Sequence, residues 1–97
     1  MTEKIANKID DRLLAAHIAD NPEFADACAA GDAEKIMYIV NSEIEKNNLH
    51  TKGSKKLLND ILKMTNGKSK ISASVGTNIL MFVWNARMSG TGFKVMA

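Results

Sequence analysis

The sequence predicts an all-α protein, a compact single-domain bundle of about five helices over residues 1–97. A chain of 97 residues suffices for one domain with one hydrophobic core. Hydrophobic residues make up 45% of it and charged residues 25%, values typical of globular proteins. Only one proline occurs, and β-branched and aromatic residues are sparse beside Ala, Leu, Met, Lys, Glu and Asn. This balance favours helix over strand and over long coil.

Apolar residues at helical spacing predict a first helix over residues 3–19. Its expected apolar residues are Ile5, Ile9, Leu13, Leu14, Ala16 and Ile18. Asn21 is a favourable N-cap for a short second helix that starts at Pro22 and ends at Gly31. Asp32 is the expected cap of a third helix over residues 33–47. The core stripe of this third helix consists of Ile36, Ile39, Val40 and Ile44.

The stretch FADACAAGDAEKIMYIV, residues 24–40, resembles the helix–turn–helix unit of an ankyrin repeat in its Ala-Ala-Gly-Asp turn. It has no Thr-Pro-Leu-His element and no second copy, whereas a stacked array needs about three repeats. The resemblance therefore implies a tight αα-hairpin and no repeat array.

Two further helices are expected in the second half of the chain. Ser54 would cap the fourth helix and Asn66-Gly67 would end it. Its apolar stripe is Leu57, Leu58, Ile61, Leu62 and Met64. Ser69 would cap the fifth helix and Gly90 would end it.

The fifth helix is apolar on almost every side. One face has the composition of an ordinary core stripe and contains Ile71, Val75, Ile79, Phe82, Val83 and Ala86. The opposite face contains Leu80, Met81, Trp84 and Met88. Such a helix is either central and enclosed by the other four, or uses its second face to contact another molecule. That molecule would be a second copy of the chain or a protein partner.

Charge is distributed unevenly along the chain. Residues 1–48 hold five Lys or Arg and ten Asp or Glu, a net charge of −5, whereas residues 49–97 hold eight and one, a net charge of +7. This acidic half and this basic half either neutralise each other within the bundle or dock on other molecules. An anionic partner for the basic half is one such molecule, and a second chain docked head to tail is another.

Lysine-rich stretches flank the fourth helix, TKGSKK at residues 51–56 and NGKSK at residues 66–70. A lysine in the first turn of a helix costs about 0.3–1 kcal/mol, and binding of an anion is one reason to tolerate it. The stretches should lie about 20 Å apart, so a nucleic-acid backbone could contact both, although a single phosphate could not. The expected phosphate-binding residues are Lys52, Gly53, Ser54, Lys55, Lys56, Lys68 and Lys70. The apolar fifth helix has few groups that read base edges, so low sequence specificity and strong salt dependence are expected.

No complete catalytic or metal-binding motif occurs in the sequence. His17 and His50 lack companions at metal-ligand spacing, and Cys28, in an alanine-rich segment, is typical of a small core residue. The carboxylates of Asp10 and Asp11 are adjacent and point in different directions on a helix. We therefore expect no enzymatic activity, no metal and no cofactor.

The sequence favours a small intracellular binding protein. The N-terminus has no signal-peptide pattern, and the longest apolar run, Ile79 to Trp84, is too short to span a membrane, so a cytoplasmic location is expected. The first hypothesis is that lysines 52–70 bind nucleic acid or another phosphate-bearing ligand. The alternative is a protein–protein interaction module or inhibitor of the phage or plasmid type, homo-oligomeric through the Leu80/Trp84/Met88 face.

Overall fold

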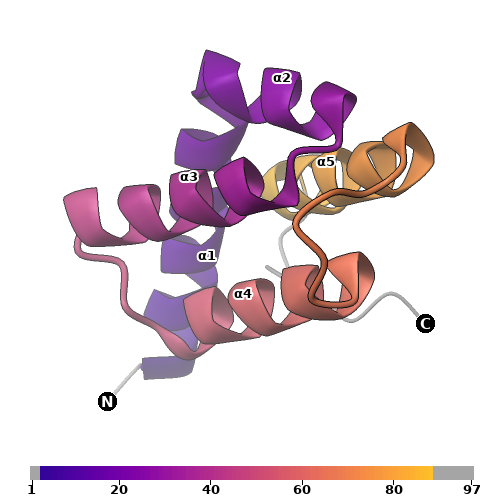
Figure 1. Ribbon diagram of the computed structural model, residues 1–97. Coiled ribbons are helices and arrows are strands. Elements are labelled where there is room, and N and C mark those ends of the chain that lie inside the picture. Colours follow the sequence, from indigo (N-terminus) through magenta and orange to yellow (C-terminus); the bar gives the residue numbers. More distant parts are fainter. Residues whose placement is uncertain (1–2, 89–97) are drawn as a thin grey trace.

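The computed structural model of the protein describes the backbone of residues 3–88 and the side chains of residues 11–88 (Figure 1). Within this part, the helices in chain order are α1 (Glu3–Asp20), α2 (Pro22–Ala30), α3 (Ala33–Lys46), α4 (Lys52–Thr65) and α5 (Ala73–Met88). The predicted all-α bundle is confirmed. The expected end of the last helix at Gly90 lies outside the described residues.

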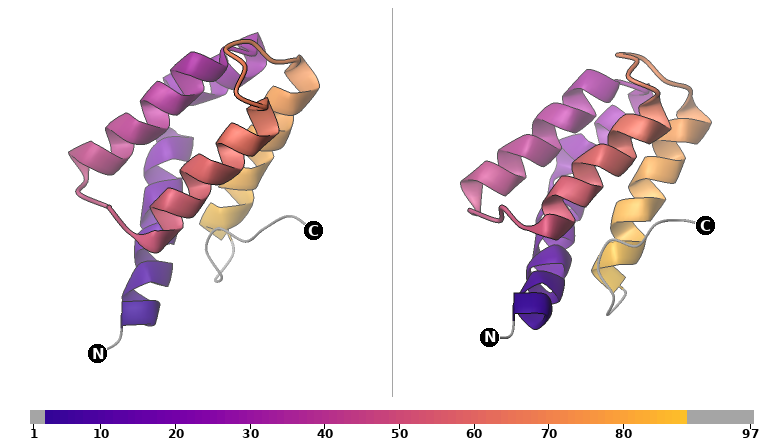
Figure 2. Two further views of the ribbon diagram at one scale, coloured as in Figure 1. Left: turned by 60° about the horizontal axis from the view of Figure 1, so that its bottom comes forward. Right: turned by 90° about the horizontal axis from the view of Figure 1, so that it is seen from below.

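The helices α3, α4 and α5 run alongside one another. Behind them lies α1, and α2 covers one end (Figure 2). Figure 2 shows α4 between α3 and α5, with α1 behind them. α2 packs against α3 and α5 at the end of the bundle where α5 begins (Figure 1). The shared core includes the fully buried side chains of Leu14, Ile18, Phe24, Ile36, Val40, Leu57, Ile61, Ile79 and Val83.

Packing of the described side chains confirms most predicted stripe positions and corrects two, while Ile5 and Ile9 of the first stripe lie outside the described side chains. The whole third-helix stripe is buried, whereas Leu13 is 47% exposed and Leu62 is 50% exposed. In α1 the core face contains Leu14, Ala15 and Ile18, which are spaced as neighbours on one side of a helix. Leu13 precedes that face by about 100°, so the packing of α1 leaves it on the rim.

The expected caps of α2 and α3 and the expected end of α4 at Asn66 are confirmed, whereas the N-caps of the last two helices are corrected. Thr51, not Ser54, caps α4: its Oγ1 accepts from the Ser54 N–H at 3.0 Å, and the Ser54 Oγ accepts from the Thr51 N–H at 2.9 Å. This reciprocal pair is a capping box. Ahead of α5, the Ser72 hydroxyl accepts from the Val75 N–H at 3.3 Å, so Ser72 replaces Ser69.

The linker between α4 and α5 is fastened to the turn between α2 and α3. The Ile71 N–H donates to the Gly31 carbonyl at 2.9 Å, and the Ala33 N–H donates to the Ser69 carbonyl at 3.0 Å. Gly31 has a φ of 68° and lies against the Ile71 carbonyl, where a Cβ would clash. Ser69 is therefore used in this pairing, which delays the start of α5 and fixes the backbone that carries Lys68 and Lys70.

None of the helices in the described part of the chain combines the length and the apolar character needed to cross a lipid bilayer.

Candidate phosphate-binding surface and exposed apolar face

The outer face of α4 carries a row of lysines. Lys52, Lys55 and Lys63 are exposed and share one helix face with the exposed Asn59, because their spacing is i, i+3, i+7 and i+11. None of the three lysines has an ion-pair partner among the described side chains. We call Lys52, Lys55 and Lys63 the α4 lysine row. It spans about 16 Å at 1.5 Å per residue.

Two members of the basic surface differ from the sequence-based expectation. Lys56 is partly buried and its Nζ lies 3.2 Å from the Asp60 carboxylate, so an internal anion already neutralises it. Lys63 was missed because it lies outside both lysine-rich stretches. Its position 11 residues after Lys52 places it on the same helix face, and this periodicity could have identified it.

The N-terminus of α4 is occupied by a carboxylate of the same chain. Asp11, on α1, is only 8% exposed, and its carboxylate lies against Gly53, where an added Cβ would overlap it. The Thr51 hydroxyl donates to Asp11 Oδ1 at 3.3 Å. A carboxylate at this position compensates the positive end of the helix dipole. Gly53 and Ser54 are both buried here, so they are removed from the candidate phosphate site.

The region where α5 begins has a different environment. A cavity of about 450 Å³ lies between the end of α4 and the start of α5. Its lining consists of Met64, Thr65, Asn66, Lys68, Lys70, Ile71, Ser72 and Val75. Both lysines are exposed, neither forms an ion pair with a described side chain, and no carboxylate lines the cavity. We call this space the linker cavity.

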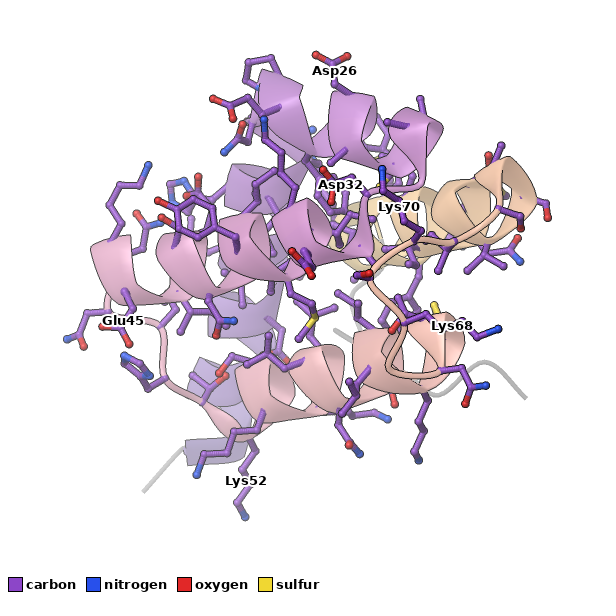
Figure 3. The ribbon with its side chains drawn as sticks, viewed as in Figure 1. Asp26, Asp32, Glu45, Lys52, Lys68 and Lys70 are labelled. Atoms are coloured by element: carbon purple, nitrogen blue, oxygen red, sulfur yellow. The ribbon has the colours of Figure 1, made fainter. Side chains whose placement is uncertain are left out.

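Few ion pairs join the acidic and basic halves of the described chain, although the halves meet where Asp32 and Lys70 form a backbone bridge. Figure 3 shows Lys52 and Lys68 near opposite ends of α4, whereas Asp26 lies on α2 across the bundle and Glu45 near the end of α3. In the described part of the chain, only Arg87–Asp20, at 3.0 Å, and His50–Glu45, at 3.5 Å, join a basic side chain of the second half to an acid of the first. No ion pair to a described side chain neutralises the exposed lysines Lys52, Lys55, Lys63, Lys68 and Lys70, although Asp32 is the backbone-bridge neighbour of Lys70.

The second face of α5 is exposed. Met81 is 54% exposed, Trp84 47% and Met88 71%, while Leu80 is partly buried. Of the two alternatives for this helix, enclosure by the other four is therefore wrong for this face. Ala19 of α1 and Ala25 of α2 are the neighbours there, and they are too small to cover it. The result is an apolar hollow of about 330 Å³ lined by Ala19, Ala25, Leu80, Met81 and Trp84.

A cation fixes the indole ring at the edge of this hollow. The Arg87 guanidinium lies 4.9 Å from the centroid of the Trp84 ring, in cation–π geometry. Arg87 also pairs with Asp20 at 3.0 Å, which links the end of α5 to the end of α1. The Arg87 guanidinium therefore covers one face of the Trp84 ring.

The buried ionisable side chains Cys28 and Glu43 have surroundings that fit a structural role. Burial raises the pKa of the Cys28 thiol to about 11, which disfavours the nucleophilic thiolate. The Glu43 carboxylate is 5% exposed, and it accepts from the side-chain amides of Asn21 and Asn47, both at 3.1 Å. No group of three or more potential metal ligands occurs among the described residues.

Comparison with known proteins found no matching family model, no significantly similar curated protein and no significantly similar solved structure.

Proposed function

We propose that the protein is a non-enzymatic nucleic-acid-binding protein that contacts phosphates through the α4 lysine row and the linker lysines Lys68 and Lys70. The observation that carries the proposal is the exposure of these five lysines without an ion pair to a described side chain. A cationic row about 16 Å long matches the axial rise of about five nucleotides, at 3.4 Å each. Lysines recognise the repeated negative charge of a backbone and not base identity, so the expected binding has low sequence specificity.

Salt dependence of binding tests this function. Five lysine–phosphate contacts predict a slope of log affinity against log salt of about −3 to −4 for a single strand. Fluorescence anisotropy with labelled random-sequence RNA and DNA, from low to physiological salt, measures this slope. Absence of binding to every such probe at low salt would contradict the proposal.

A matched pair of double variants locates the surface. Lys55→Gln with Lys63→Gln removes two charges from the α4 lysine row, and we expect the slope to become shallower by about 1.5. Lys35→Gln with Lys46→Gln makes the same charge change at lysines that pair with Glu23 and Glu43. This second variant should bind nearly as the parent does. Equal losses in both would mean that net charge alone, and not the α4 surface, drives binding.

The exposed apolar face supports a second candidate function, the binding of a protein partner or of another copy of the chain. Trp and Met are enriched at the centres of protein interfaces, and large exposed apolar patches on a monomer usually mark contacts. Sedimentation over a wide concentration range tests self-association. If the protein associates, Trp84→Ala should weaken the association by at least tenfold, because buried aromatic anchors are worth about 2 kcal/mol or more. Met37→Ala, at a partly buried side chain on α3, is the control for a generally weakened fold.

A further inference from the structure

The linker cavity combines an apolar floor with a cationic rim. Met64, Ile71 and Val75 form the floor and pack against the hydrophobic core. Lys68 and Lys70 supply the charge, and both belong to the linker whose backbone pairs with the turn between α2 and α3. In Figure 3 the Lys68 side chain extends outward beside the end of α4, and the Lys70 side chain extends toward Asp32. The volume of about 450 Å³ falls within the range of small-molecule sites, about 300–1,000 Å³.

This combination selects a ligand that has both an apolar surface and a negative charge. A lone phosphate would leave the floor uncovered, and a purely apolar ligand would leave the lysines without a counter-charge. The Met64 thioether is polarizable and makes favourable contacts with aromatic rings. The Asn66 amide and the Ser72 hydroxyl add donors and acceptors beside the floor, of the kind that bind the edge of a heterocycle.

We propose that the linker cavity binds one unpaired nucleotide, with its base on the Met64/Ile71/Val75 floor and its phosphate at the Lys68 and Lys70 rim. The inference rests on the proposed nucleic-acid binding and adds a preference to it. A base can reach this floor only when it is unpaired, so single strands bind more tightly than duplexes of the same length. The same chemistry is present in a free mononucleotide and in a nucleotide of a strand.

Affinities for a single strand and for a blunt duplex of equal length measure the preference. We expect the single strand to bind about tenfold more tightly than a duplex at equal salt, because only an unpaired base can bury its apolar face on this floor, at roughly 25 cal/mol per Å² of apolar surface. Val75→Phe fills the cavity without changing charge and should remove this ratio while leaving duplex binding unchanged. A tenfold ratio that survives Val75→Phe would overturn the cavity assignment.

A second pair of variants avoids any effect of repacking. Lys70→Gln and Lys63→Gln both remove one exposed cation, but only Lys70 lines the cavity. Lys70→Gln should lower single-strand affinity more than duplex affinity, whereas Lys63→Gln should lower both equally. Thermal unfolding monitored by circular dichroism confirms that each variant is folded. Equal effects of the two variants on the ratio would also overturn the assignment.

A free mononucleotide separates failure of this site from failure of the proposed function. In amide NMR spectra, adenosine and uridine monophosphate should shift the signals of residues 64–75 and leave those of Lys52 and Lys55 unchanged. Such shifts support the cavity even if no oligonucleotide binds, in which case the ligand is a free nucleotide. Oligonucleotide binding without these shifts and without a single-strand preference supports the lysine surface alone and overturns the cavity.

Discussion

The starts of α4 and α5 have similar sequences and different surroundings. A short stretch rich in Lys, Ser and Gly forms the first turn of α4 and the linker before α5, and neither helix has an acidic residue in its first turn. At α4, a carboxylate from α1 lies against the first turn and a capping box holds the backbone. At α5, a single serine caps the helix beside a cavity with two lysines and no acid. The two helix starts therefore differ in whether a carboxylate from a distant part of the chain lies against them, which neither lysine-rich stretch alone reveals.

The largest expected change in the free energy of unfolding concerns the contact between the first turn of α5 and α2. Gly76 is buried against the backbone carbonyl of Cys28, so a Cβ there would clash with an atom that cannot rotate away. Gly76→Ala should lower the free energy of unfolding by about 3 kcal/mol, as measured by urea denaturation. Thr77→Ala, at the next, exposed position, should change it by less than about 0.5 kcal/mol. Similar values for the two would show that α2 and α5 separate without cost.

Removal of the internal anion tests the other side of the comparison. Asp11→Asn keeps the shape of the side chain but removes the charge beside the start of α4, and we expect a loss of stability of about 1 kcal/mol. Asp26→Asn, at an exposed carboxylate on α2, is the matched control and should be nearly neutral. If Asp11 blocks phosphate binding at α4, Asp11→Asn should also raise the affinity for oligonucleotides more than Asp26→Asn does. Equal increases in affinity for the two variants would mean that packing, and not the Asp11 charge, prevents phosphate binding at the start of α4.

The two caps should differ in strength. Thr51→Ala removes the hydroxyl that accepts from the Ser54 N–H and donates to Asp11, while the backbone half of the capping box remains, so we expect a loss of about 1 kcal/mol. Ser72→Ala removes the 3.3 Å cap hydrogen bond and an exposed 3.1 Å hydrogen bond to the Ser74 hydroxyl, and should cost about 0.5 kcal/mol. Thermal or urea unfolding of both variants measures the difference. A larger loss for Ser72→Ala would reverse the ranking of the two helix starts.

The last prediction concerns the rate at which a thiol reagent modifies Cys28, and not the free energy of unfolding. Its thiol is 1% exposed and has a pKa of about 11, raised from 9.0 by burial, so little thiolate forms at pH 8. A thiol reagent should therefore react at a rate limited by opening of the protein. In Gly76→Ala, which strains the contact between α2 and α5, the reaction should be faster. Rapid labelling of the folded parent protein at pH 8 would contradict the packing of this contact.

Local signals in the sequence predicted the helices well. Asn21 and Gly31 carry out the capping roles that their residue types favour, and the stripe from Ile36 to Ile44 has one unambiguous apolar face. Such features depend on residues within one or two turns of each other. They therefore do not require knowledge of the tertiary structure.

The features that were missed depend on contacts between distant residues. Asp11 lies 40 positions before Thr51, and no local pattern connects the two. Ser69 resembles a cap, but its backbone pairs with Ala33, so α5 starts later than expected. Whether the Trp84 face is covered depends on the size of Ala19 and Ala25, which belong to other helices. In each case the deciding atoms come from another part of the chain.

The pairing of the α4–α5 linker with the α2–α3 turn has a consequence for hydrogen exchange and folding order. Amide protons of Ala33 and Ile71 are held in a loop pairing and not in a helix, yet their exchange should report the opening of the whole bundle. The pairing closes a long loop around α3 and α4, a step with a high entropic cost. Such contacts form late in folding, after the local helices, so protection of these two amides should appear last when refolding is followed by pulse labelling.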